Sequence, residues 1–208
     1  MKIFQQSDIP LKMERQGLKF NAFQQNQFKY LYLLINDCGL KHNKPLFCMA
    51  KSKTMEKTII NNYEEFESYL GKEIGVSEYL EITQEQIDKF AEATLDYQWI
   101  HTDPERAKKE SPFKSTIAHG YLTVSLLTNM WYQIVDVRNV KMIVNYGIEK
   151  LRFQQPVMVN HRIRARVSLN DIRNLRGIAK IQVKIIVEIE GQKKPAYDAL
   201  VTFLYHFE

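Results

Sequence analysis

The chain has 208 residues, 45% hydrophobic and 25% charged, which is typical of a soluble globular protein with one hydrophobic core. The formal net charge of +5 belongs wholly to residues 1–54, since these hold nine Lys or Arg and three Asp or Glu, and residues 55–208 carry a net charge of −1. The larger part therefore lacks the basic footprint expected of a nucleic-acid-binding protein.

Residues 1–54 differ from the rest of the chain and show no sustained hydrophobic period of two or 3.6. Both cysteines, Cys38 and Cys48, fall there, and two cysteines provide neither a disulfide framework nor metal-site spacing. The longest early apolar run, YLYLLI, is far too short to span a bilayer, so we expect a cytoplasmic protein without membrane segments. We predict a basic N-terminal extension, either poorly structured or not native, followed from about Met55 by one domain at 55–208.

The first part of this domain carries helix signals. A short helix is predicted at about 63–71. Thr83 and Gln86 form a capping box that opens a longer helix, which ends before the letters DYQWIH. The stretch TDPERAKKE restarts a short helix, with Asp103 as N-cap and Pro104 at its first position.

A different kind of helix follows in the stretch STIAHGYLTVSLLTNMWYQIVDV, beginning at Gly120. Its apolar residues cover almost every face, and a helix that is apolar all round is buried. With about 16 residues it is too short to cross a membrane, so it is predicted to be a core helix. The apolar residues are Tyr121, Leu122, Val124, Leu126, Leu127, Met130, Trp131, Ile134 and Val135.

The remaining sequence is predicted to form strands. KMIVNYGIEKLRFQQPV contains one or two, HRIRARVSL alternates arginine with apolar residues, and GQKK joins IAKIQVKIIVEIE to AYDALVTFLYHF as a hairpin. Several long antiparallel strands after one buried helix predict an α+β hot-dog fold, in which an antiparallel sheet wraps around a central helix. Arg162, Arg164 and Arg166 share one strand face, which favours a solvated face; a site for the phosphates of a ligand is the alternative.

Two short stretches contain candidate catalytic residues. In DYQWIH, Asp96 and His101 could form an acid/base pair, but five residues do not span one helix face, so the chain must turn between them. Taken alone, this stretch is better explained as a helix end and a loop. In IAHG, Gly120 opens the buried helix, where free N–H groups and the helix dipole could stabilise an oxyanion. The simpler interpretation is that Gly120 permits a tight turn and that His119 packs or caps.

Together the two stretches lie in a segment, ATLDYQWIHTDPERAKKESPFKSTIAHGYLTVSLL, that resembles the MaoC-like (R)-specific enoyl-CoA hydratases, most closely the branch of nodulation protein N. YGIEKLRFQQPV also looks like the family's strand after the helix. The resemblance runs from about Met55 to the C-terminus. It implies that Asp96 and His101 hold and activate the water that attacks C3 and relay a proton to C2. It also implies that Gly120 is the oxyanion-hole glycine.

The resemblance implies further roles and shows departures. Thr128 and Trp131 match positions that line the acyl pocket in related hydratases, and the large Trp131 would shorten it. Gln98 stands where many relatives have Asn and could hydrogen-bond the substrate amide or the catalytic loop. We also predict that His119 contributes to substrate binding. Leu95 stands where a Gly often precedes the catalytic Asp, which bears on the local turn.

We therefore predict a hydro-lyase that interconverts trans-2-enoyl thioesters and (R)-3-hydroxyacyl thioesters. It would need no cofactor and no metal, and its partner would be an acyl-CoA or acyl-carrier-protein thioester. The family resemblance also implies a homodimer. Two alternatives remain open: a hot-dog thioesterase, which attacks C1, and a non-catalytic acyl-thioester-binding protein.

Overall fold

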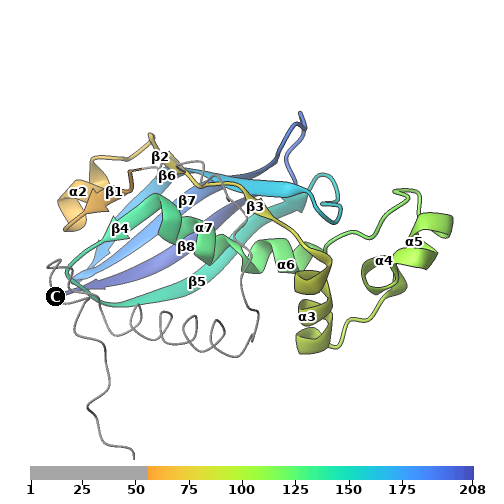
Figure 1. Ribbon diagram of the computed structural model, residues 1–208. Helices are drawn as coiled ribbons and strands as arrows, with labels where there is room; N and C mark the ends of the chain where they lie inside the picture. Colours follow the sequence, from red (N-terminus) through yellow and green to blue (C-terminus); the bar gives the residue numbers. More distant parts are fainter. Residues whose placement is uncertain (1–55) are drawn as a thin grey trace, which may run out of the picture. The chain divides into compact units, whose positions relative to one another are not determined.

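The computed structural model describes residues 56–208 (Figure 1). The chain divides into two units, of which the second begins at Lys53 and is the one described below. The predicted extension at 1–54, with both cysteines, lies outside the described residues, and the boundary near Met55 stays a prediction. Within the described part, no helix has the length and apolar character needed to cross a membrane.

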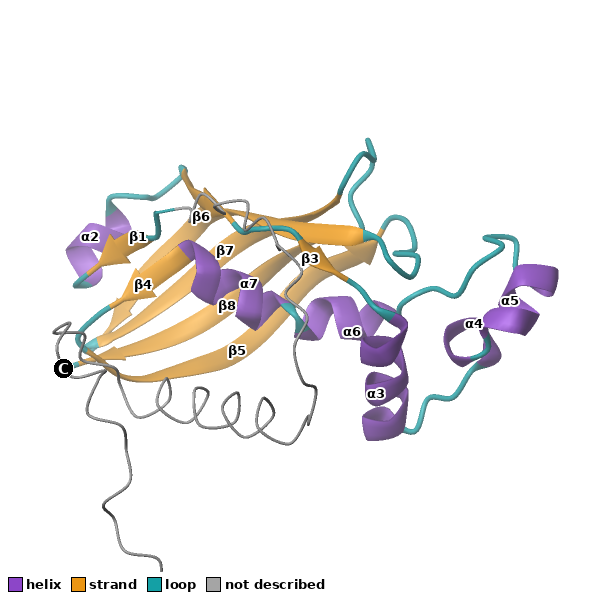
Figure 2. Cartoon of the chain, viewed as in Figure 1, coloured by secondary structure: helices purple, strands orange, loops and turns teal. Residues whose placement is uncertain are grey.

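A six-stranded sheet forms the body of this unit (Figure 2). Its strands are β2 (Glu73–Val76), β3 (Leu80–Glu81), β5 (Val140–Phe153), β6 (Arg162–Leu175), β7 (Ile178–Ile189) and β8 (Tyr197–Phe207). They lie in the order β2-β6-β7-β8-β5, with β3 also paired to β6, and all pairs are antiparallel. The predicted strands are confirmed, and the stretch that allowed one or two strands forms β5 alone.

The long strands alternate buried apolar and outward polar side chains, as their sequences predict. On β6, Ala165 is fully buried between two outward arginines. Arg164 Nε lies 2.7 Å from a Glu188 oxygen, and Arg166 Nη1 lies 2.7 Å from a Glu73 oxygen. Because neighbouring carboxylates neutralise these guanidinium groups, the structure favours the solvated face over a site for coenzyme A phosphates.

The central helix crosses one face of the sheet as two segments, α6 (Gly120–Ser125) and α7 (Leu127–Ile134) (Figure 1). Leu126, between the two segments, keeps right-handed helical angles, and its N–H donates to the Leu122 carbonyl at 3.1 Å, so the predicted helix continues with a local irregularity. Ser125 Oγ donates to the Tyr121 carbonyl at 2.8 Å. Such side-chain bonds to the preceding turn compete with the regular helix ladder and bend helices.

The two segments differ in burial. In α7, Trp131 is only 1% exposed; its Nε1–H donates to the Tyr205 hydroxyl at 2.6 Å and its ring stacks on Phe203. In α6, by contrast, Tyr121 is 71% exposed. The prediction of a helix buried all round was therefore wrong for both segments, because Tyr121 on α6 and Tyr132 on α7 are exposed, although one face of α7 belongs to the core. A hydrophobic pattern marks apolar side chains without distinguishing the core from the mouth of a cavity.

Smaller elements border the sheet. β1 (Thr58–Ile60) pairs in parallel with β4 (Val135–Val137) as a separate two-stranded sheet. Between β1 and β2 lies α2 (Tyr63–Glu67), shorter than the predicted helix at 63–71. Three more helices are α3 (Gln84–Thr94), α4 (Trp99–Thr102) and α5 (Pro104–Glu110). Figure 1 shows α4 and α5 projecting beyond the end of the sheet, and α6 follows α5 in the sequence.

Candidate active site

The end of α3 determines where Asp96 lies. The predicted capping box is present, because Thr83 and Gln86 exchange side-chain and backbone hydrogen bonds and fix the start of the helix. The helix ends at Leu95, whose φ of +61° is in the left-handed region that glycine usually supplies at this position. Leu95 thus forms the turn before Asp96 although many relatives have a glycine at this position.

His101 lies on the one-turn helix α4, which the sequence did not predict. Its Nδ1 is 2.7 Å from the Ile117 carbonyl oxygen. Because a carbonyl oxygen only accepts, Nδ1 must carry the proton, and Nε2 keeps a free lone pair. Gln84 Nε2 donates to the His101 carbonyl at 2.7 Å and ties this turn to α3. The chain therefore turns between Asp96 and His101, as it must if side chains five residues apart are to meet.

His119 immediately precedes α6 and holds the other side of the site. Its ring is buried and stacks on the ring of His101, with 3.8 Å between centroids and 27° between planes. Nε2 donates to the backbone oxygen of Asp96 at 3.0 Å. The nearest Asp96 carboxylate oxygen lies 3.9 Å from the same nitrogen, too far for a hydrogen bond. His119 therefore holds the main chain of Asp96 and leaves its carboxylate available.

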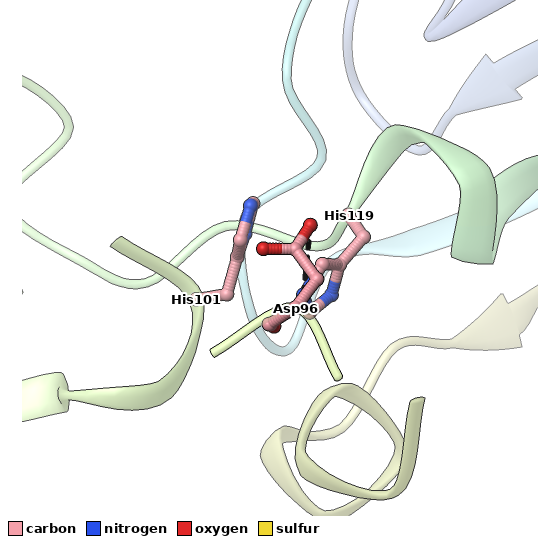
Figure 3. Close-up of side chains that lie close together, drawn as sticks. All are labelled: Asp96, His101 and His119. Carbon is pink, nitrogen blue, oxygen red and sulfur yellow. Dashed lines mark hydrogen bonds and ion pairs between the residues drawn. The ribbon is translucent and has the colours of Figure 1, made fainter. Parts of the chain in front are cut away.

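The three side chains converge at one point (Figure 3). One polar atom from each of Asp96, His101 and His119 lies within 4.8 Å of the others. A water molecule that makes hydrogen bonds of about 2.8 Å can bridge two atoms at this separation. The Asp96 side chain is 56% exposed whereas His101 is almost buried, so the cluster faces solvent from one side only.

The same cluster fits a metal ion poorly. Imidazole lone pairs lie in the ring plane, and a zinc ion must sit about 2.0–2.1 Å from each ligating nitrogen along that direction. The rings of His101 and His119 are stacked, so their lone pairs run side by side instead of meeting. Nε2 of His119 is also committed to a backbone carbonyl.

The environment of His101 keeps its ring neutral. Burial lowers the pKa of His101 below its ordinary value of 6.5, and the nearby imidazole of His119 acts in the same direction. The Ile117 carbonyl and the Asp96 carboxylate oppose this shift. A neutral imidazole with a free Nε2 is the form that can accept a proton from water.

Gly120, the first residue of α6, lies against the ring of Phe153 at the end of β5. A Cβ at this position would be 2.8 Å from the Phe153 Cζ atom, closer than real carbon contacts allow. Among residues 56–208, no acceptor takes the Gly120 N–H. The close approach thus explains the glycine sterically, and the unused donor is what an oxyanion site requires.

A pocket of about 510 Å³ opens beside this cluster. Asp96, His101, His119 and Gly120 all line it, so the structure brings four of the seven predicted site residues together. The pocket also has apolar walls, which suits an acyl group. Further lining residues are Tyr121, Thr123, Phe153, Gln154, Gln155 and Ala196.

Three predicted site residues lie elsewhere. Gln98 is exposed and does not line the pocket; its carbonyl accepts the His101 backbone N–H at 2.9 Å. Thr128 is half-buried on α7, and Trp131 is part of the core. Neither lines the pocket, so the acyl-pocket positions implied by the resemblance are not part of the pocket in this chain.

Sequence reasoning missed Thr123 and Phe153 as pocket residues. Thr123 lies one turn after Gly120 on α6, so helical spacing alone could have suggested it. Phe153 stands in the quoted stretch YGIEKLRFQQPV, but only the pairing of β5 with β8 brings it to Gly120. Such a contact between distant segments has no local signal.

Comparison with known proteins agrees with this arrangement of sheet and helix. The chain is 46% identical over 127 residues to 3-hydroxyacyl-thioester dehydratase Z of Mycobacterium tuberculosis, which covers 61% of this chain and 83% of the relative. It is 43% identical over 135 residues to nodulation protein N of Rhizobium leguminosarum, covering 64% and 83%. Among solved structures, the R-hydratase PhaJ1 of Pseudomonas aeruginosa has a TM-score of 0.54 at 18% identity, covering 67% of this chain and 83% of that one.

The fold and the site define a class of hot-dog hydro-lyases. Residues 65–190 match the family model described as MaoC like domain. The chain belongs to this MaoC-like dehydratase family. A monoamine oxidase regulatory protein from Archaeoglobus shares the fold, with a TM-score of 0.54 at 25% identity over 64% of this chain and 88% of that one.

Proposed function

We propose that the protein hydrates trans-2-enoyl thioesters to (R)-3-hydroxyacyl thioesters and catalyses the reverse dehydration. The observation that carries this proposal is the placement of the Asp96 carboxylate, the His101 ring and Gly120 around one pocket. The names of relatives support it, since one is a 3-hydroxyacyl-thioester dehydratase and another an R-hydratase.

The chemistry follows from the donors and acceptors. Asp96 and Nε2 of His101 hold one water molecule between them, and His101 accepts a proton from it. The oxygen forms a bond to C3, and the electron pair of the double bond moves through C2 onto the thioester oxygen. Gly120 N–H stabilises that oxyanion. When the carbonyl re-forms, C2 takes the proton from the acid/base pair, so atoms and charge balance without a cofactor.

The substrate carrier and the assembly also belong to the proposal. The thioester would be carried by coenzyme A or by an acyl-carrier protein. We propose a homodimer, because β5 is an edge strand of the described sheet and exposes Met142, Tyr146 and Ile148. Sedimentation at equilibrium should give twice the chain mass, whereas a single chain mass at micromolar concentration would contradict it. We also propose that the protein is located in the cytoplasm, which subcellular fractionation would test.

Incubation of the purified protein with crotonyl-CoA tests the activity. Loss of the enoyl absorbance without release of free thiol indicates hydration, and chiral analysis should find the (R)-3-hydroxy product. Release of free thiol would instead show a thioesterase. If the protein binds acyl-CoA but converts no enoyl-CoA of any length, it is a non-catalytic binding protein.

A further inference from the structure

Buried residues form part of the pocket lining, among them Thr123, Val157 and Ala196. Tyr197, the next residue in the chain after Ala196, has no exposed surface and donates its hydroxyl to the Thr123 carbonyl at 3.2 Å. This hydrogen bond joins α6 to β8 beside the pocket-lining residues Thr123 and Ala196.

Phe153 closes the adjoining wall. Three atoms of its ring lie 2.8 to 3.1 Å from the position of a Cβ on Gly120. The ring also meets Tyr197 and Tyr121 edge to face, with centroids 6.0 Å and 6.3 Å away. Neighbours on three sides therefore hold the ring, even though 46% of Phe153 is exposed to the pocket and solvent.

Beyond this wall, the space between helix and sheet is filled. Trp131 stacks on Phe203 at 5.6 Å between centroids and 10° between planes, and both are almost fully buried. Phe203 also packs against Tyr205, whose hydroxyl accepts the Trp131 N–H. An acyl chain that starts at Gly120 thus has no open path along α7.

We propose that Phe153 and Tyr197 form an end wall that restricts this enzyme to short 2-enoyl thioesters. This substrate class rests on the proposed hydratase activity of the same pocket. Phe153 is the specificity-determining residue of the pair, because it lines the pocket directly and its ring can be shortened without cutting the hydrogen bond of Tyr197.

The wild-type protein provides the first test, which needs no variant. Values of kcat/KM are measured for crotonyl-, hexenoyl-, octenoyl- and dodecenoyl-CoA, all as trans-2-enoyl thioesters. One methylene in a tight apolar pocket changes kcat/KM by roughly tenfold or more. We expect the highest value for crotonyl-CoA or hexenoyl-CoA and a steep fall for the longer chains.

Phe153→Ala provides the second test. Removal of the ring should raise the ratio of octenoyl-CoA to crotonyl-CoA kcat/KM by roughly tenfold, the scale of such pocket discrimination. Tyr132→Ala is the control, since Tyr132 is an exposed aromatic residue on α7 that does not line the pocket. The control should keep the wild-type ratio. Phe153→Leu serves if the alanine variant is unstable by thermal unfolding.

The outcomes separate the two proposals. Wild-type protein that converts octenoyl- and dodecenoyl-CoA as well as crotonyl-CoA overturns the end wall and leaves the hydratase activity standing. An unchanged length ratio in folded Phe153 variants overturns the role of Phe153. No conversion of any enoyl-CoA overturns the proposed function and this inference with it.

Discussion

At the scale of single residues, Asp96 and His101 work from different environments. The Asp96 carboxylate is largely solvated, whereas the His101 ring is nearly buried and fixed by the Ile117 carbonyl. A solvated carboxylate can orient water, and a buried neutral imidazole can accept a proton. In the proposed mechanism these positions assign the first role to Asp96 and the second to His101.

Removal of either group should abolish most of the activity while the protein stays folded. We expect Asp96→Asn and His101→Ala each to lower kcat by roughly 10²–10⁴-fold, the usual range for acid/base groups. Initial rates with crotonyl-CoA measure this, and circular dichroism checks the fold. His206→Ala is the control, since His206 lies on β8 and does not line the pocket. Near-wild-type turnover in either active-site variant contradicts the mechanism.

The lowered pKa of His101 predicts a pH profile. Catalysis needs the unprotonated ring, so kcat/KM should fall only as the pH drops below the ordinary histidine value of 6.5. Between the folded and unfolded pKa values the unfolded chain binds more protons. The stability contribution of neutral His101 is thus complete above the unfolded pKa and is lost as the pH falls toward the folded one. An NMR titration of His101, assigned with His101→Ala, that gives a pKa at or above 6.5 would contradict this.

Leu95 should be replaceable by glycine with a gain in stability. Its left-handed φ costs a non-glycine residue about 1–2 kcal/mol, and its side chain is 76% exposed, so little packing is lost. The greater freedom of glycine in the unfolded chain offsets part of this gain. We expect Leu95→Gly to raise the free energy of unfolding by about 0.5–1 kcal/mol in urea titrations. Leu95→Ala keeps the strained φ and should show no gain.

At the scale of elements, the contact between α6 and β5 fixes the site. Gly120→Ala should place a methyl group against the Phe153 ring. We expect a loss of about 1–3 kcal/mol in unfolding free energy, the range for overpacking, together with a loss of turnover.

A double-mutant cycle checks the origin of that loss. If the Phe153 ring causes it, Gly120→Ala should cost less stability in a Phe153→Ala background, with a coupling of about 0.5–3 kcal/mol. Additive effects would show that the alanine at 120 acts through the backbone alone. The control pair is Gly120→Ala with Tyr132→Ala, which should be additive.

Which elements could be predicted depends on whether their signal is local. The capping box of Thr83 and the Asp103–Pro104 start of α5 are local signals, and both are confirmed. The alternation in β6 is equally local. The single turn α4 depends on a side-chain hydrogen bond that ties it to α3, which periodicity does not encode.

The same distinction applies to the site. The resemblance placed Asp96, His101 and Gly120 at one pocket, where the structure also has them. It did not predict the stack of His119 on His101, because ring orientation depends on tertiary packing. It assigned Trp131 to the acyl pocket, but the Tyr205 hydroxyl and the Phe203 ring hold this side chain in the core.

At the scale of the whole molecule, the described unit holds the sheet, the central helix and the residues named above as lining the pocket. Deletion of residues 1–54 should therefore leave kcat/KM for crotonyl-CoA unchanged. The measurement compares the full chain with a chain that begins at Met55, at equal active concentration. An inactive or unfolded truncated chain would contradict the boundary.

Main-chain oxygens hold both histidines: Ile117 contributes the acceptor for His101, and Asp96 contributes the acceptor for His119. No side-chain substitution at position 96 or 117 removes such an acceptor. Substitutions at these two positions therefore leave the main-chain acceptors of both imidazoles in place. Evolution, or a protein engineer, could exchange the carboxylate at 96 for another functional group and still find two pre-oriented imidazoles. The two histidines should therefore keep their positions when the functional group at position 96 is replaced.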